Sequence, residues 1–334
     1  MQTEKADFDR NREGLYGGLP EVRDRQTSSS DSGMRRRREP ATIKNPVEWS
    51  GAQIARAMHT AGSFGHSLHH IQETIHSPTP TVSRISAADI RAALAEGLDD
   101  FGAYRSDVIF LCVIYAAVGL VVSQFLFGTA LLPLLFPLAS GFAIVGPFAA
   151  VGLYEMSRQR ERGIRVNWKN AFDVLETPAF GALAVLGTVL ILVFLVWLAA
   201  AWLIFEGTLG PQLPNSIGAF FRDVLMTNSG RAMMVAGIGV GFLFALLAMT
   251  ISVVAFPLLL DHDVGLDTAI KTSVRAVFSN PGPMALWGLI VAAALVIGSL
   301  PLFVGLAVVL PVLGHATWHL YRKLVRVTDA GIAE

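Results

Sequence analysis

Long apolar segments without any charged residue dominate the chain beyond residue 107. Segments free of Asp, Glu, Lys and Arg extend over residues 108–154, 177–205, 232–260 and 280–318. A helix needs roughly 20 consecutive apolar residues to cross a bilayer, whereas a surface helix of a soluble protein keeps a polar face. The pattern therefore predicts an all-α polytopic membrane protein, built as a bundle of transmembrane helices.

Six transmembrane helices are expected, at about residues 108–127, 131–156, 180–205, 232–258, 283–299 and 302–321. The last two share one apolar segment, which as a single helix would be about 58 Å long, nearly twice the roughly 30 Å hydrocarbon core. The stretch Gly298-Ser299-Leu300-Pro301 lies midway and is typical of a chain break. Two helices joined by a tight turn are therefore predicted here.

The first segment before the spans, residues 1–45, is polar and contains four consecutive arginines, Arg35–Arg38. It has too little apolar surface to offset the entropy of ordering, so we expect a disordered basic arm. The arginines fit an orientation signal on a solvated arm better than a site for RNA or anionic lipid. The polar start of the chain predicts no cleavable signal peptide.

The second segment, residues 46–81, is a histidine-containing amphipathic segment followed by a linker. Apolar residues recur every three or four positions between residues 54 and 75, which is the spacing of one helix face. His66 and His70 are four residues apart, as in some metal sites, but no cysteine, aspartate or second spaced pair completes a site. A polar helix face is the favoured interpretation.

The six-helix membrane domain is expected over residues 82–327. Ser86 and Asp89 have the spacing of a capping box, which predicts the start of an amphipathic helix. The apolar stripe of that helix consists of Ile90, Leu94, Leu98 and Phe101. Glu96 and Asp100 lie off the stripe. We expect this helix to lie against the membrane or against the bundle, just before the first span.

Two loops resemble each other and predict amphipathic interfacial helices. The sequences GIRVNWKNAFDVL, from Gly163, and GLDTAIKTSVRAV, from Gly265, place apolar residues at matching helical positions. We expect each to lie in the membrane interface. The spans that precede the two loops, and the last span, contain Pro147, Pro257 and Pro311. Proline inside a helix removes a backbone donor and bends the helix.

The distribution of Lys and Arg sets the predicted orientation. Basic residues cluster in the N-terminal arm, in the loop around residues 158–169 and in the tail around residues 322–326, whereas the links at 128–130 and 299–301 are nearly uncharged. Short loops rich in Lys and Arg remain in the cytoplasm. Six spans with both termini in the cytoplasm place every basic cluster on the cytoplasmic side.

Composition excludes several classes of function. The net charge is zero, and the single cysteine, Cys112, permits no intrachain disulfide and no Cys-X-X-Cys site. No serine-hydrolase elbow, zinc-protease, phosphate-loop or dinucleotide-binding motif is present. We therefore expect no catalytic residue, no metal, no cofactor, no nucleic-acid partner and no enzymatic activity. The lipid bilayer is the one partner that the sequence implies, and no oligomeric state is indicated.

Ionisable residues collect where the proline-containing spans end on the predicted cytoplasmic side. They are Glu155, Asp261, His262, His315 and His319. If these spans converge, the side chains form a polar cluster, and ionisable groups close to a membrane are costly to bury and often functional. The alternative, which the sequence favours, places each residue at the wet end of a helix, with Trp318 and Tyr321 as interface anchors.

Three further segments connect the chain to a known family: GLDDFGAYRSD, SGFAIVGPFAAVGLYEMSRQRERG and LPVLGHATWHLYRKLV. From about Ile85 to Val325 the chain resembles an uncharacterised bacterial family of predicted integral membrane proteins, a domain of unknown function. The resemblance implies a bacterial inner-membrane location and no activity. Some members carry a label relating them to cytochrome c oxidase subunit I, but this chain has neither the ligating histidines nor the spans of that enzyme.

The leading hypothesis is a non-enzymatic scaffold, assembly or regulatory component of the bacterial cytoplasmic membrane. One alternative is a small-solute or proton carrier that uses the polar cluster, and a weaker one is a haem or metal site at His315 and His319. Carriers have polar or broken helices at mid-membrane. The predicted mid-span residues are mainly Ala, Leu, Val, Gly and Phe, which favours the first hypothesis.

Overall fold

The computed structural model of the protein describes residues 80–103, 132–166, 168–210, 216–300 and 304–326. The chain divides into two units, Met1–Ser50 and Gly51–Glu334, and all the described residues belong to the second unit. The predicted disordered arm, the histidine-containing segment up to residue 79 and the predicted first span lie outside the described residues.

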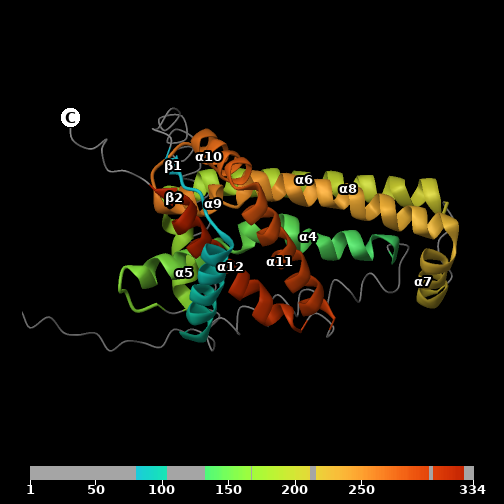
Figure 1. Ribbon diagram of the computed structural model, residues 1–334, viewed down its shortest axis with the longest axis horizontal. Coiled ribbons are helices and arrows are strands. Elements are labelled where there is room, and N and C mark those ends of the chain that lie inside the picture. Colours follow the sequence, from blue (N-terminus) through green and yellow to red (C-terminus); the bar gives the residue numbers. More distant parts are fainter. Residues whose placement is uncertain (1–79, 104–131, 167, 211–215, 301–303, 327–334) are drawn as a thin grey trace, which may run out of the picture. The chain divides into compact units, whose positions relative to one another are not determined.

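The described fold is all-α, with one short pair of strands. A helix over residues 87–103 has no label in Figure 1 and is drawn in teal. The labelled elements are β1 (Thr81–Val82), η1 (Leu132–Leu134), α4 (Leu135–Ala149), α5 (Val151–Glu161), η2 (Trp168–Glu176), α6 (Phe180–Thr208), α7 (Ile217–Met226), α8 (Asn228–Ser252), α9 (Ala255–Asp261), α10 (Leu266–Ser279), α11 (Pro281–Ser299), α12 (Leu306–Leu324) and β2 (Val325–Arg326).

Three helical stretches are long and apolar enough to cross a bilayer: Phe180–Thr208, Asn228–Asp261 and Pro281–Ser299. The bent pair α4 and α5 gives a fourth if it is taken as one span, with an angle of 40° at the break. Helix α12, which contains most of the predicted sixth span, is not among these stretches. The described residues thus contain three or four of the six expected spans, and the six-span arrangement is not confirmed.

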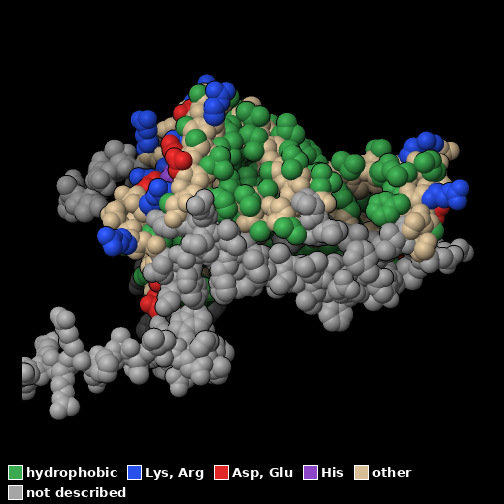
Figure 2. Space-filling view, turned by 90° about the horizontal axis from the view of Figure 1, so that it is seen from below, with side chains coloured by type: hydrophobic (Ala, Val, Ile, Leu, Met, Phe, Trp, Pro, Cys, Tyr) green, Lys and Arg blue, Asp and Glu red, His purple; other side chains and the backbone are tan. Residues whose placement is uncertain are grey.

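The long helices expose apolar surface to their surroundings. Figure 1 shows α6 and α8 side by side with α4 next to them, and α7 at one end. Val235 of α8 is 75% exposed, and Leu203 of α6 and Leu289 of α11 are 66% exposed. Hydrophobic side chains cover the middle of the face in Figure 2, with Lys and Arg gathered at its two ends. Large exposed apolar areas mark surfaces that contact a membrane or another protein, and the length of these apolar helices fits a membrane.

Proline explains the break between α8 and α9. Pro257 has no N–H, and its ring conflicts with the carbonyl four residues earlier, that of Val253, where the helix is interrupted. The interruption leaves the Val254 N–H without a helical acceptor. This N–H donates instead to Ser273 Oγ of α10, over 3.2 Å. A buried backbone donor is thereby satisfied by a neighbouring helix, as a membrane protein requires.

The two loops that resemble each other form different structures. The loop after Gly163 contains the 3-10 helix η2, whereas the loop after Gly265 contains the α-helix α10. Both are helical, as predicted, and of the matched apolar positions on α10, Val277 is buried, whereas Ile270 and Val274 are partly buried. The buried face of α10 consists mainly of small side chains, Thr268, Ala269, Thr272, Ser273 and Ala276. Small residues allow the backbones of adjacent helices to approach closely.

The two ends of the described chain segment meet in a short antiparallel ladder. Thr81 of β1 lies opposite Arg326 of β2, and Val82 lies opposite Val325. Buried Asn280, between α10 and α11, holds the residues that follow β1. Its Oδ1 accepts a hydrogen bond from the Ile85 N–H at 2.8 Å, and its Nδ2 donates to the Ser83 carbonyl at 3.1 Å. These contacts fix helix 87–103 against the bundle.

Trp318 and Tyr321 of α12 are buried, so their prediction as interface anchors is wrong. They are 0% and 1% exposed and belong to the hydrophobic core together with Phe256 of α9. Helix α12 packs against α5, α9 and α11, which enclose its aromatic residues. The core of the described fold therefore extends into the end of the bundle where α9 and α12 both terminate.

Candidate functional site

Helix 87–103 carries the acidic side chains of the site. It begins with the predicted capping box: the Ser86 N–H donates to Asp89 Oδ2 at 2.8 Å, and the Asp89 N–H donates to Ser86 Oγ at 3.4 Å. Gly97 then allows close contact with α12, because a Cβ at this position would lie 2.6 Å from the backbone nitrogen of Ala316. This contact brings Glu96 and Asp100 against the histidines of α12.

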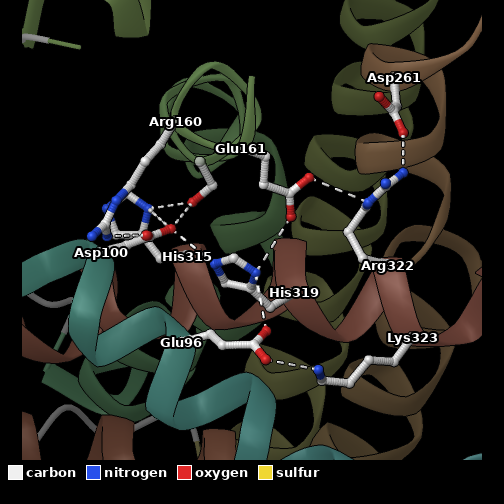
Figure 3. A network of polar contacts seen from close by, with 10 residues as sticks. Glu96, Asp100, Arg160, Glu161, Asp261, His315, His319, Arg322 and Lys323 are labelled. Atoms are coloured by element: carbon white, nitrogen blue, oxygen red, sulfur yellow. Dashed lines mark hydrogen bonds and ion pairs between the residues drawn. The ribbon is translucent and has the colours of Figure 1, made fainter. Parts of the chain in front are cut away.

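The two helices face each other with matching four-residue spacings. Glu96 and Asp100 are four residues apart on helix 87–103, and His315, His319 and Lys323 repeat every four residues on α12, so each set lies on one helix face. Lys323 Nζ is 2.9 Å from Glu96 Oε1, and His319 Nδ1 is 3.2 Å from Glu96 Oε2. Acidic and basic groups therefore alternate across the contact (Figure 3).

Asp100 lies at the centre of the contacts. His319 Nε2 is 2.9 Å from Asp100 Oδ2, and the hydroxyl of Ser157, on α5, donates to the same oxygen at 2.5 Å. Arg160 of α5 donates to the other oxygen, Oδ1. The carboxylate is buried, with its side chain 5% exposed. One side chain thus joins helix 87–103, α5 and α12.

The hydrogen bonds of Ser157 define the tautomer of His315. The single hydroxyl proton of Ser157 goes to Asp100, so Ser157 Oγ accepts from His315 Nδ1, 2.8 Å away. His315 therefore carries a proton on Nδ1. Its ring is fully buried, at 0% exposure. His315 is oriented through Ser157, since its distance to Asp100 Oδ2 is 3.8 Å.

Hydrogen bonding lowers the pKa of Asp100. Burial alone raises the pKa of a carboxyl, but here the hydrogen bonds from His319 and Ser157 and the nearby charges of His315 and His319 outweigh it, and the pKa falls to about 2. Asp100 is therefore ionised at neutral pH. Its negative charge is compensated by Arg160, which is 38% exposed, and by groups on α12.

A second branch of contacts links His319 to the end of α9. Glu161 Oε1 is 3.6 Å from His319 Nδ1, and Glu161 Oε2 is 3.3 Å from Arg322 Nε. Arg322 Nη1 in turn donates to Asp261 Oδ2 at 3.1 Å, and the Tyr321 hydroxyl donates to the same oxygen at 3.1 Å. We define the polar network as Glu96, Asp100, Ser157, Arg160, Glu161, Asp261, His315, His319, Arg322 and Lys323. Tyr321 contacts this network through Asp261.

Glu155 belongs to a separate set of contacts. Its Oε2 is 2.7 Å from Arg158 Nη2, and its Oε1 accepts from Gln159 Nε2 at 2.7 Å. Arg158 also donates to the Leu260 carbonyl at 2.5 Å, which attaches α5 to the last turn of α9. The structure therefore does not bring Glu155 against the two histidines.

Among the five residues predicted from the sequence, His315, His319 and Asp261 lie in the polar network. His262 is adjacent to it, with Nε2 3.2 Å from Asp261 Oδ2. The carboxylates of Glu96 and Asp100, which contact the histidines, were not among the predicted residues. The available signal was their four-residue spacing, which places both acids on one side of the helix and away from its apolar stripe. Ser157 and Glu161, on α5, had no comparable signal.

The described residues contain no group of three or more His, Cys, Asp and Glu side chains that could hold a metal ion. Both nitrogens of His319 face carboxylates, and Nδ1 of His315 faces Ser157. The chemistry available here is ion pairing and hydrogen bonding between helices.

Comparison with known proteins gives one family. Residues 135–261 match the family model described as "Predicted integral membrane protein (DUF2189)". The chain is an integral membrane protein with several apolar helices. The match confirms the expected resemblance from α4 through α9, and the matched residues include Ser157, Glu161 and Asp261 of the polar network. No curated protein and no solved structure matches the chain.

Proposed function

We propose that the protein is a non-enzymatic component of the bacterial cytoplasmic membrane, acting as a scaffold, assembly or regulatory protein. The polar network holds helix 87–103, α5, α9 and α12 together as one rigid unit. This unit is predicted to lie on the cytoplasmic side, where it can present a fixed surface to a partner. Hydrogen bonds to charged groups contribute about 1.5–3 kcal/mol each, so a connected set holds the helices firmly.

One observation carries this proposal. Within the described part of the chain there is a cavity of about 640 Å³ that is lined almost entirely by apolar side chains. The charged side chains of the network contact one another and do not line this cavity. Its side-chain hydroxyls are those of Tyr154, Ser252 and Thr317, and no Asp, Glu, His, Lys or Arg is among its lining residues. A carrier or an enzyme needs such groups along a path or around a substrate.

Reconstitution into liposomes with an enclosed pH-sensitive dye tests the proposal against a proton carrier. We expect proton flux no greater than in protein-free liposomes for the wild type, for Asp100→Asn and for Asp99→Asn. Asp99 is the matched control, because it is the exposed neighbour of Asp100 on the same helix. A flux in the wild type that Asp100→Asn abolishes and Asp99→Asn retains would overturn the scaffold proposal.

Cross-linking in native membranes, followed by mass spectrometry, tests the scaffold role directly. We expect the wild type and Gly102→Ala to recover the same partner at a fixed ratio. Gly97→Ala displaces helix 87–103 from α12 and should lower that ratio several-fold at equal protein level. Equal recovery from all three proteins, or no recurrent partner, would contradict the proposed role.

A further inference from the structure

The large cavity lies between helices of the membrane region. Its lining comes from α4, α8, α10, α11 and α12, together with Ala150, Tyr154 and Val253. A volume of about 640 Å³ is within the range of roughly 300–1,000 Å³ that is usual for ligand pockets. The cavity is separate from the polar network, since none of the ten network residues lines it.

The cavity is elongated along the spans. On α11 its lining extends from Pro281 to Leu295, about 21 Å at 1.5 Å per residue. On α8 it extends from Phe242 to Ser252, about 15 Å by the same measure. Both helices are candidate membrane spans, so the long direction of the cavity follows that of the lipid acyl chains.

The cavity is open towards the lipid-facing surface. Phe242, Phe278 and Leu289 line it, and their side chains are 63%, 73% and 66% exposed. An apolar groove that opens sideways into the bilayer and runs with the spans matches one ligand in shape and chemistry, an extended hydrocarbon chain.

A cation lies beside one end of the cavity. Phe278 lines this end, and Arg275 is one helical turn earlier on α10, on the same side of the helix. Arg275 is exposed, and within the described residues it forms no ion pair or hydrogen bond. Lys271, a further turn away, is already paired with Asp267 at 3.0 Å. Arginine binds phosphate with two parallel hydrogen bonds, so Arg275 provides a site for an anionic headgroup.

We propose that this cavity binds one acyl chain of an anionic phospholipid, whose headgroup phosphate pairs with Arg275. The acyl chain lies between α8 and α11 and covers their facing apolar side chains. The lipid thereby fills a space that the described helices leave between them and adds to their packing.

Trp287 provides a direct probe, because it lines the cavity and is only 2% exposed. Bromine atoms on an acyl chain quench tryptophan fluorescence at contact distance. The protein is reconstituted in nanodiscs of phosphatidylcholine with increasing brominated phosphatidylglycerol, beside a Trp287→Phe control that isolates the contribution of this residue. We expect saturable quenching of Trp287 at low mole fractions of brominated phosphatidylglycerol, and several-fold weaker quenching by brominated phosphatidylcholine.

Matched variants separate the cavity from the general lipid shell. Ala292 lines the cavity and its neighbour Ala293 is exposed without lining it, so Ala292→Phe should abolish the saturable quenching and Ala293→Phe should retain it. Gly288→Leu fills the same space and serves if Ala292→Phe fails to fold. A quenching curve unaffected by either filling variant would overturn the proposal and indicate shell lipid only.

Arg275→Gln tests the headgroup contact. It should raise the half-saturating fraction of brominated phosphatidylglycerol several-fold and leave quenching by brominated phosphatidylcholine unchanged. Arg231→Gln, at the beginning of α8, is the control and should change neither curve. Equal quenching by the two lipids, or identical curves for Arg275→Gln and the wild type, would contradict anionic recognition at this site.

Discussion

His319 Nε2 lies 2.9 Å from Asp100 Oδ2, although the two residues are 219 positions apart in the chain. Both side chains are largely enclosed, with 11% and 5% exposure. Ion pairs in such a setting are strongly destabilising when only one partner is removed, because the other remains buried without compensation. Substitutions in this pair therefore give the most sensitive test of whether the polar network stabilises the fold.

Asp100→Asn should lower the free energy of unfolding by about 2 kcal/mol, since it removes the negative charge that pairs with Arg160 and weakens the hydrogen bond to His319. This loss of stability is smaller than the loss on breaking a fully buried pair, because Arg160 is partly exposed. Thermal melts in detergent measure the change, with Asp99→Asn as a control that should lie within about 0.5 kcal/mol of wild type. The double variant with His319→Ala should be less destabilised than the sum of the single variants, and strict additivity would argue against a direct interaction.

Acid stability should depend on Asp100. Its pKa in the folded protein is about 2, below its ordinary value, so the unfolded chain binds more protons between about pH 4 and pH 2. The stabilisation from Asp100 is fully present above that window and is lost as the pH falls through it. The melting temperature of the wild type should fall more steeply over this interval than that of Asp100→Asn. Parallel curves for the two proteins would show that Asp100 is not the group responsible.

Gly97→Ala should destabilise the protein by about 1–3 kcal/mol through overpacking. The new Cβ would lie 2.6–2.8 Å from backbone and Cβ atoms of Ala316, and a backbone contact cannot be relieved by a rotamer change. Gly102 on the same helix has no atom within 4 Å of such a Cβ, so Gly102→Ala should not destabilise the protein. Denaturation in detergent compares the two variants, and equal stability would mean that helix 87–103 is not held tightly against α12.

Asn280→Ala should cost about 2–3 kcal/mol, because it leaves the Ile85 N–H and the Ser83 carbonyl without their partner at a buried corner. The same substitution at Asn228 affects one exposed contact with Arg231 and should change stability by less than about 0.5 kcal/mol. Amide hydrogen exchange gives an independent measurement: the Ile85 amide should lose protection in Asn280→Ala and keep it in Asn228→Ala.

Part of the candidate site was predictable from short-range patterns. The four-residue spacing of His315 and His319 places both rings on one face, and the spacing of Ser86 and Asp89 forms the capping box that begins the acidic helix. The choice of partners was not predictable. The sequence grouped Glu155 with the histidines because each lies where a proline-containing span ends. In the structure Glu155 contacts Arg158 and Gln159, and Asp100 from another helix contacts His319.

The long charge-free apolar segments by themselves determined that the protein is an all-α membrane protein, because such a segment of about 20 residues crosses a bilayer as a helix with its backbone groups satisfied internally. Only the tertiary structure decided that Trp318 is buried and which residues contact Asp100. Both depend on which helices approach closely enough to touch, as at Gly97 and Ala316, and that approach is fixed by packing between residues distant in the chain.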